Sequence, residues 1–378
     1  MTQGFAPPPY PYDRLSGLIA VANRHAGGAI DLSIGTPCDP PPGVSLEALA
    51  RSGSERGYPA SIGSSTYRGA AAGWLERRLG AVVDPDDGLA ACIGTKEFVA
   101  GLPHLLRLRT PDRDTVLYPA VSYPSYAMGA TLAGCRAVPV PVDDRWRLRL
   151  DAIESADAER ALCLWVNTPG NPTGALDDLA SAREWGRAHD VLVCSDECYA
   201  EFTWVGEPRT ILAPGAGVRH GGVLAVHSIS KRSNLAGVRA GFYAGDPEIV
   251  GYLSEVRKHL GLMMAGPNQA AAAVAWGDDA HVEAQRNRYL NRLRRLWSAL
   301  GSVGIEVPLP DGGFYLWAAA PDGDAWGLAA RLAEVAGVVG SPGEFYGGSS
   351  PGHVRLAMVQ PDDRIELAAR RIEERGAL

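Results

Sequence analysis

The sequence predicts an α/β fold in which a mainly parallel, seven-stranded sheet is sandwiched by helices and accompanied by a smaller α+β domain. Two observations support this prediction. Between residues 89 and 265, short apolar runs alternate with stretches of helical periodicity, which is typical of a parallel sheet covered on both faces. Three successive apolar runs also end in polar residues, which suits a ligand at the carboxyl ends of parallel strands.

The elements of the sheet domain follow in order along the chain. Residues 1–11 form a Pro/Tyr-rich arm, 12–25 a short helix, and 31–37 a strand that runs into a turn. A helix is expected at 64–80, because its apolar residues recur on one side. Strands are then expected at 89–93, 115–118, 136–141, 161–166, 191–195, 223–227 and 239–244, with helices at about 96–108, 124–133, 177–189 and 247–260.

A change of pattern after the last of these elements indicates a second domain. One long helix is expected at about 267–300, and a β-α-β-like region with strands at 314–317 and 353–357 follows it. We therefore expect a large domain at 35–280 and a small domain that combines 1–34, including the N-terminal arm, with 281–378.

The composition argues against several classes of protein. A chain of 378 residues that is 46% hydrophobic can bury a large core, and its net charge of −7 argues against nucleic acid as a partner. No apolar run reaches the length of a membrane span, and the first residues lack the pattern of a signal peptide. The six cysteines are scattered and show no metal-site spacing, so we expect reduced thiols, no metal and a cytoplasmic protein.

One lysine stands out as a candidate for chemistry. The apolar run from Val223 to Val226 leads into a polar turn that holds Ser228, Ser230 and Lys231, and Arg239 follows eight residues after the lysine. Lysine is rarely buried without a partner, and one reason to place it at a strand end is a Schiff base with a carbonyl cofactor. A nearby serine and arginine suit a phosphate. Taken alone, the pattern fits a solvated loop lysine equally well.

Two upstream segments favour the catalytic interpretation. The apolar run 162–167 ends in the Pro/Gly turn 168–174, and the run 191–195 ends in Asp-Glu-Cys-Tyr. If these runs are neighbouring parallel strands, their carboxyl ends meet at one edge of the sheet. The polar residues expected to converge there are Asn171, Asp196, Tyr199 and Lys231.

These motifs occur in a characteristic order. Asn-Pro-Thr-Gly begins at Asn171, Asp-Glu-Cys-Tyr at Asp196, and Ser-Ile-Ser-Lys ends at Lys231, with Arg239 eight residues on. The ordered set resembles the fold-type I pyridoxal 5'-phosphate (PLP) aminotransferases of class I and II over nearly the whole chain. The resemblance implies the fold of that family, PLP as cofactor, amino acids and 2-oxo acids as substrates, and a homodimer with composite active sites.

The resemblance also implies a role for each site residue. Lys231 would form the Schiff base and carry a proton, and Asp196 would face the pyridine nitrogen and keep it protonated. A helix cap is the alternative for Asp196. The remaining cofactor contacts would be Asn171 and Tyr199 at the phenolic oxygen, Thr95, Lys96, Ser228 and Arg239 at the phosphate, and Tyr123, with Tyr126 as its alternative, stacked on the ring.

Three further residues have implied roles outside the cofactor ring. Arg355 would clamp the substrate α-carboxylate, helped by the Gly35 backbone, with Asn171 also contacting the substrate. Tyr58 would reach the cofactor phosphate of the neighbouring subunit. The alternatives are a surface salt bridge for Arg355 and a surface tyrosine for Tyr58.

Within the family, the closer resemblance is to N-succinyldiaminopimelate aminotransferases of lysine biosynthesis. It is carried by segments 11–15, 31–37, 93–97, 195–199, 230–237 and 256–259. Val238 departs from that branch, which usually has an aromatic there. The implied reaction passes an amino group between glutamate and N-succinyl-2-amino-6-oxopimelate. Both are polyanions, so Arg232, Arg257 and Lys258 are candidates for binding them.

Three other functions remain open at this stage. The first is a different aminotransferase, for aspartate or aromatic acids. The second is a PLP-dependent carbon–sulfur lyase, because the cofactor supplies the chemistry and the protein selects which bond breaks. The third is a non-enzymatic regulator with an aminotransferase-like ligand domain, which the acidic composition disfavours.

Overall fold

The computed structural model describes residues 5–213, 220–349 and 352–375. The chain divides into two compact units. The large unit comprises residues 36–290 and 310–314, and the small unit comprises 1–35, 291–309 and 315–378. Whether they fold as separate domains, as the expected boundaries 35–280 and 281–378 imply, stays a prediction. None of the described helices is long and apolar enough to cross a membrane.

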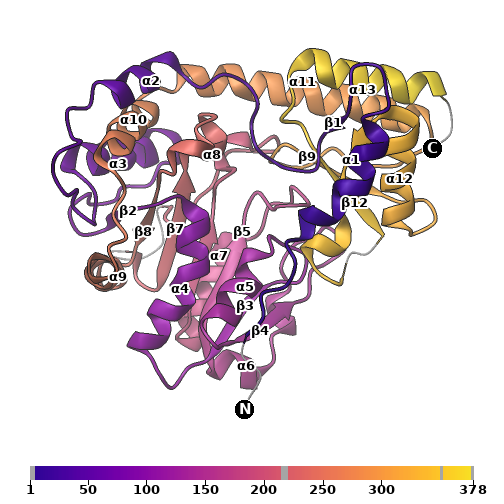
Figure 1. The fold of residues 1–378 in the computed structure, drawn as a ribbon. Coiled ribbons are helices and arrows are strands. Elements are labelled where there is room, and N and C mark those ends of the chain that lie inside the picture. The colour runs from indigo at the N-terminus through magenta and orange to yellow at the C-terminus, as the bar shows by residue number, and fades with distance from the viewer. Residues whose placement is uncertain (1–4, 214–219, 350–351, 376–378) are drawn as a thin grey trace. The chain divides into compact units, whose positions relative to one another are not determined.

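The large unit is built on a seven-stranded sheet (Figure 1). Its strand order is β2 (Leu89–Cys92), β8 (Gly241–Gly245), β7 (Val223–Ser228), β6 (Leu192–Asp196), β5 (Ala161–Asn167), β3 (Thr115–Pro119) and β4 (Arg136–Val140). All neighbours are parallel except β8, which is antiparallel to both β2 and β7. The predicted mainly parallel α/β fold is therefore confirmed, with one reversed strand.

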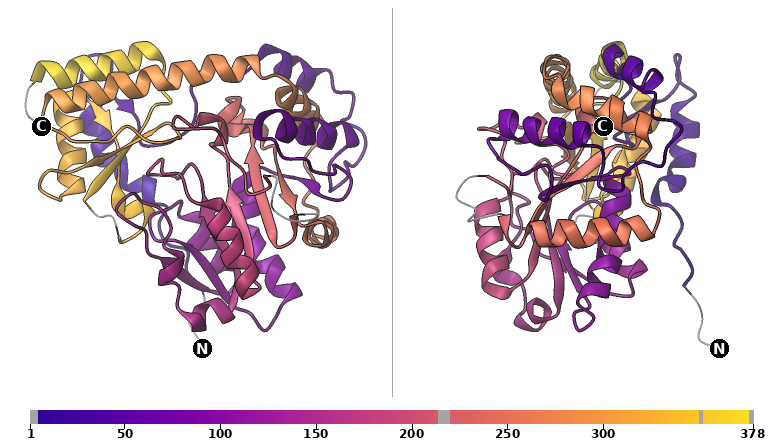
Figure 2. Two further views of the ribbon diagram at one scale, coloured as in Figure 1. Left: turned by 180° about the vertical axis from the view of Figure 1, so that it is seen from behind. Right: turned by 90° about the vertical axis from the view of Figure 1, so that its left-hand side faces the viewer.

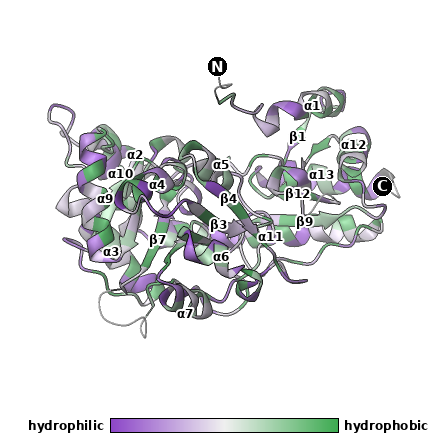
Figure 3. Cartoon of the chain, turned by 90° about the horizontal axis from the view of Figure 1, so that it is seen from below, coloured by the Kyte–Doolittle hydropathy of each residue, from purple (hydrophilic) through white to green (hydrophobic). Residues whose placement is uncertain are grey.

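Helices cover both faces of this sheet, because alternate residues of each strand point to opposite sides. On one face, Ala225 and Val193 belong to a core cluster with α3 (Ser65–Leu79), α7 (Leu179–His189) and α10 (Gly266–Gly277). On the other, Leu224 and Val226 belong to a cluster with α4 (Thr95–Arg109), α5 (Ser125–Leu132) and α9 (Pro247–His259). In Figure 3, strands such as β7 are mostly green (hydrophobic), whereas the covering helices carry both green and purple (hydrophilic) residues.

The prediction of one long helix at about 267–300 is wrong. The chain instead forms α10 and a separate helix, α11 (Ala280–Ser302). Asp278 is extended between them, and its carboxylate accepts the backbone N–H of Ala280 at 3.0 Å. An aspartate after a glycine thus ends one helix and caps the next.

Shorter elements complete the large unit. Helix α2 (Gly43–Ala50), which the sequence pattern did not reveal, packs against α10. The others are α6 (Ser155–Glu159), α8 (Ile229–Arg232) and the 3-10 turns η2 (Leu150–Ala152), η3 (Ala200–Phe202) and η5 (Ala236–Val238).

The small unit contains a second, antiparallel sheet in the order β11 (Ser341–Pro342), β12 (His353–Ala357) and β9 (Tyr315–Ala319). The strand expected at 31–37 is reduced to β1 (Ile30–Asp31), paired in parallel with β10 (Val338–Val339). The helices are η1 (Pro11–Leu15), α1 (Ser16–Ala22), α12 (Ala325–Ala336), η6 (Gly343–Tyr346) and α13 (Asp362–Arg375). Helix α13 lies beside the second half of α11 (Figure 2), where Arg295 pairs with Glu366 at 2.7 Å.

Candidate active site

The carboxyl ends of β5, β6 and β7 form one edge of the large sheet, as the sequence predicted. In the register of these parallel strands, Asn167 lies opposite Asp196, and Asp196 opposite Val226. The Asn167 amide donates to the backbone carbonyl of Asp196 at 2.9 Å and accepts the backbone N–H of Asn171 at 2.8 Å. The Pro/Gly turn is therefore tied to the strand that carries Asp196, which brings two of the predicted residues together.

Asp196 is a buried carboxylate held at both oxygens. The Tyr126 hydroxyl donates to Oδ2 at 3.0 Å, and the Cys198 backbone N–H donates to Oδ1 at 3.2 Å. Burial raises the pKa of Asp196, while the bonds from Cys198 and Tyr126 and the charge of His227 act in the opposite direction. A buried carboxylate of this kind is stabilised by a cationic partner, so its chemistry fits the protonated nitrogen of a pyridine ring.

The bond from Tyr126 was missed by sequence reasoning, which considered this residue only as a ring for stacking. Tyr126 is fully buried, and its ring stacks on Trp165 at 5.2 Å. Tyr123 is half-buried and meets Tyr126 edge to face at 6.1 Å. The only available signal was the second tyrosine of Tyr-Pro-Ser-Tyr, one helical turn after the first.

The Arg239 guanidinium lies against the N-terminus of α4. Gly94 precedes this helix with φ +72°, and a Cβ atom there would collide with the guanidinium of Arg239. Arg239 itself adopts a left-handed φ of +53°. A helix N-terminus with an adjacent guanidinium fits a phosphate group, so Gly94 leaves the space that this arrangement needs.

Other predicted phosphate residues lie at strand ends or at this helix. Ser228 ends β7, and its hydroxyl donates to the Ser230 hydroxyl at 2.7 Å. Thr95, the first residue of α4, accepts a bond from the Cys198 thiol at 3.3 Å. The Lys96 side chain is exposed, with Nζ 6.0 Å from the centre of the Tyr123 ring. For Lys96, the backbone amide is thus the group at the helix N-terminus.

Lys231 lies on the one-turn helix α8, next to a firmly anchored arginine. Arg232 is buried; its Nε is 3.1 Å from Glu201 Oε1, and its guanidinium packs over the rings of Trp74 and Trp276. These contacts fix the turn that carries the half-buried Lys231. The prediction that Arg232 binds polyanionic substrates is wrong, because its charge is already paired with Glu201.

The same correction applies to Arg257. Its guanidinium is 1% exposed and forms a two-pronged pair with Glu97, at 2.7 and 2.9 Å. Lys258, in contrast, is exposed and lies 3.5 Å from Glu255. A buried arginine that is paired with a carboxylate is unavailable for a substrate. The Glu97–Arg257 pair instead links helix α4 to helix α9.

The remaining aromatic candidates differ sharply in exposure. Tyr199 is buried at the end of the Asp-Glu-Cys-Tyr motif, and its ring meets Phe314 edge to face at 5.3 Å. Tyr58 is 98% exposed. A role for Tyr58 in a neighbouring subunit therefore stays a prediction.

In the small unit, Gly35 and Arg355 share one aromatic neighbour. Arg355 is 2% exposed, donates to the Ser33 carbonyl, and lies over the Tyr315 ring at 4.2 Å and the Tyr346 ring at 4.8 Å. A Cβ atom at Gly35 would collide with the Tyr315 hydroxyl. The guanidinium is thus held in one orientation by buried rings, unlike a surface salt bridge.

Comparisons with known proteins agree with this geometry. Residues 28–372 match the family described as Aminotransferase class I and II. A probable aminotransferase of Mycobacterium tuberculosis is 42% identical, covering 97% of this chain and 85% of the relative. The 4-dedimethylamino-4-oxo-anhydrotetracycline transaminase OxyQ of Streptomyces rimosus is 41% identical, covering 97% and 99%.

Among solved structures, a probable N-succinyldiaminopimelate aminotransferase from Thermus thermophilus superposes with a TM-score of 0.85. It is 32% identical, with 97% of this chain and 100% of that chain covered. The buried carboxylate, the guanidinium at the start of α4 and these likenesses lead to one conclusion: the chain belongs to the class I and II aminotransferases, which use pyridoxal 5'-phosphate.

Proposed function

We propose that PLP binds at the carboxyl edge of the large sheet, with its phosphate at the N-terminus of α4. Thr95, Lys96, Ser228 and Arg239 would hold the phosphate. The observation that carries this proposal is the Arg239 guanidinium against the Gly94 backbone, at the start of a helix with no side-chain cap. Such a helix end offers backbone N–H groups to an anion.

The residues around the ring would divide the chemistry among them. Bound PLP supplies a ring that accepts the electrons of the bond broken at the amino-acid Cα. Asp196 would keep the ring nitrogen protonated, because a buried carboxylate favours a cation beside it. Asn171 and Tyr199 would hydrogen-bond the phenolic oxygen, Tyr123 would stack on the ring, and Lys231 would bind the cofactor and move the proton.

Arg355 would bind the α-carboxylate of every amino-acid substrate. Its orientation is fixed by Tyr315, Tyr346 and the Ser33 carbonyl, which suits recognition of a carboxylate by two parallel hydrogen bonds. The Gly35 backbone would assist, and Asn171 would contact the substrate as well.

For the overall reaction, we propose transfer of an amino group between glutamate and N-succinyl-2-amino-6-oxopimelate. The support is the ordered set of motifs and the 32% identity to the probable N-succinyldiaminopimelate aminotransferase. Arg232 and Arg257 do not contribute to this proposal, since both are buried in ion pairs.

A second acceptor is favoured by a specific observation. The chain is 41% identical to an anhydrotetracycline transaminase over nearly the full length of both proteins. The oxo group of a 4-dedimethylamino-4-oxo-anhydrotetracycline, the compound in the name of that relative, is therefore the second candidate acceptor. It differs from the first in charge, since it lacks a distal succinyl group.

A panel of substrates followed through cofactor absorbance tests these proposals. Glutamate should convert the bound cofactor to its amine form, and 2-oxoglutarate should return it. Each acceptor is then added to the amine form: N-succinyl-2-amino-6-oxopimelate, a fused-ring ketone, oxaloacetate and an aromatic 2-oxo acid. Fast return with the first alone would support the proposed substrate. Release of a thiol or of ammonia without return would indicate a lyase instead.

A further inference from the structure

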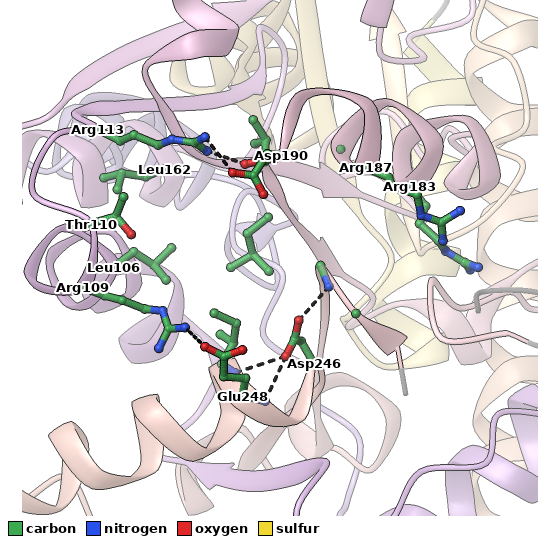
Figure 4. Close-up of a pocket in the computed structure, with 16 residues that line it drawn as sticks. Leu106, Arg109, Thr110, Arg113, Leu162, Arg183, Arg187, Asp190, Asp246 and Glu248 are labelled. Atoms are coloured by element: carbon green, nitrogen blue, oxygen red, sulfur yellow. Dashed lines mark hydrogen bonds and ion pairs between the residues drawn. The ribbon is translucent and has the colours of Figure 1, made fainter. Parts of the chain in front are cut away.

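Two helices of the large unit, α4 and α9, are joined by two ion pairs. Glu97, in the first turn of α4, pairs with Arg257 near the end of α9. Arg109, the last residue of α4, pairs with Glu248 in the first turn of α9. Figure 4 shows this second pair, where the Arg109 guanidinium points at the Glu248 carboxylate beside a pocket of about 690 Å³.

The pair at the start of α4 is built far more rigidly than the pair at its end. Arg257 is 1% exposed and donates through Nη1 and Nη2 to the two oxygens of Glu97, at 2.7 and 2.9 Å. Its guanidinium also lies over Phe98 at 5.6 Å and Tyr243 at 5.9 Å. In contrast, the Glu248 side chain is 79% exposed. A buried fork of this kind holds its partner in one geometry.

Glu97 also holds the turn that precedes α4 through a hydrogen bond. Its Oε2 atom accepts the backbone N–H of Ile93 at 3.2 Å, so the carboxylate reaches back across the N-terminus of α4. The turn between them contains Gly94, whose backbone lies against Arg239. One carboxylate therefore links Arg257 to the backbone that the phosphate would contact.

We propose that the Glu97–Arg257 pair is a positioning device for the phosphate-binding turn, residues 93–96. It sets the orientation of the backbone N–H groups, and Arg257 neutralises a carboxylate that would otherwise repel the phosphate. The inference rests on the proposed phosphate site at α4. Arg257 acts through Glu97 and is not itself a phosphate ligand, because both of its terminal nitrogens are engaged by that carboxylate.

The charge argument predicts an unequal effect of the two partners. Arg257→Met leaves an unneutralised carboxylate beside a dianion, so the dissociation constant of PLP should rise about tenfold or more. Glu97→Gln removes the carboxylate together with its repulsion and should raise it only about two- to fivefold. Adding Glu97→Gln to Arg257→Met should restore much of the lost affinity.

The experiment measures equilibrium binding of PLP and of pyridoxal, which lacks the phosphate, to the apo forms of these variants. Pyridoxal affinity should change by less than about twofold, because its contacts lie at the sheet edge. Arg109→Met and Glu248→Gln are matched controls, since they break the other ion pair between the same two helices. They should leave the affinity for both compounds unchanged.

The outcomes separate this inference from the phosphate site on which it rests. Arg239→Ala should weaken PLP and spare pyridoxal; an equal loss of both would refute the phosphate site itself. If Arg239→Ala behaves as expected while Arg257→Met weakens both compounds equally, or matches the Arg109→Met control, the positioning role is wrong. Should Arg257→Met fail to fold, Arg257→Lys keeps the charge but loses the fork, and a selective loss of PLP affinity is again expected.

Discussion

At the scale of single residues, the position of the Lys231 backbone is fixed mainly by the contacts of the next residue, Arg232. Arg232 is locked between two tryptophans and Glu201, so the half-buried lysine one residue earlier has a fixed backbone. Lys231→Ala should abolish transamination while the variant remains folded, because the anchoring contacts belong to Arg232. Borohydride reduction of the wild-type protein, followed by peptide mapping, should find the cofactor attached to Lys231. Lys258→Ala is the control for the labelling alone, since loss of that exposed lysine should leave the cofactor attached to Lys231. A labelled peptide from elsewhere would disprove the assignment.

Arg355 permits a second test at this scale. Arg355→Lys keeps the positive charge but loses the two-pronged geometry. Binding of all amino-acid substrates should weaken together, by about 2–5 kcal/mol if the pair is buried when the substrate is bound. The measurement is kcat/KM for glutamate and for each acceptor of the panel. If only the succinylated substrate were affected, Arg355 would belong to a distal pocket.

At the scale of secondary structure, the strands of the large sheet could be predicted because each is an apolar run bounded by turn residues. The expected strand at 161–166 is observed as Ala161–Asn167, and the one at 115–118 as Thr115–Pro119. The prediction of one helix at 267–300 was wrong, because Asp278, where the helix breaks, looks in the sequence like an ordinary polar residue on a helix surface. The reversal of β8 could not be predicted either, because β8 is antiparallel to both β7 and the sequence-distant β2, and no local pattern reveals a strand's direction.

The N-terminus of α4 offers a prediction for an element. Gly94→Ala imposes a left-handed φ on a residue with a Cβ and directs that atom at Arg239. The variant should lose about 1–3 kcal/mol of stability and bind PLP more weakly. Gly80→Ala is the matched control, because Gly80 also has a positive φ but a Cβ there meets nothing within 4 Å. Thermal unfolding of both apo variants and PLP titration would show whether only Gly94→Ala affects the cofactor.

At the scale of the whole molecule, the order of the motifs predicted the family, whereas the ion-pair partners of individual charged residues could not be predicted. Arg232 and Arg257 appear in the sequence as ordinary basic residues. Their partners Glu201 and Glu97 lie far away along the chain, and burial of each pair depends on helices packed from distant segments. The Tyr126–Asp196 bond was missed for the same reason, since it joins residues on separate elements.

Assembly is the last property that the chain itself suggests. Tyr58 is 98% exposed, and Val44 and Leu46 on the nearby helix α2 are also largely exposed. Large apolar side chains gathered on one segment are typical of an interface between subunits. The resemblance to the family implies that Tyr58 reaches the cofactor of the neighbouring subunit. On both grounds, we predict a homodimer with C2 symmetry, in which each Tyr58 completes the partner's cofactor site.

Mixing two defective variants tests this arrangement. Tyr58→Phe subunits retain Lys231, and Lys231→Ala subunits retain Tyr58. If Tyr58 acts across the interface, a mixed dimer has one site with both defects and one intact site, so activity should rise above that of either variant alone. If Tyr58 serves its own chain, every site with a lysine also carries phenylalanine, and mixing cannot increase activity. Subunit exchange is verified separately by native mass spectrometry, so that a lack of recovery would count against the composite site.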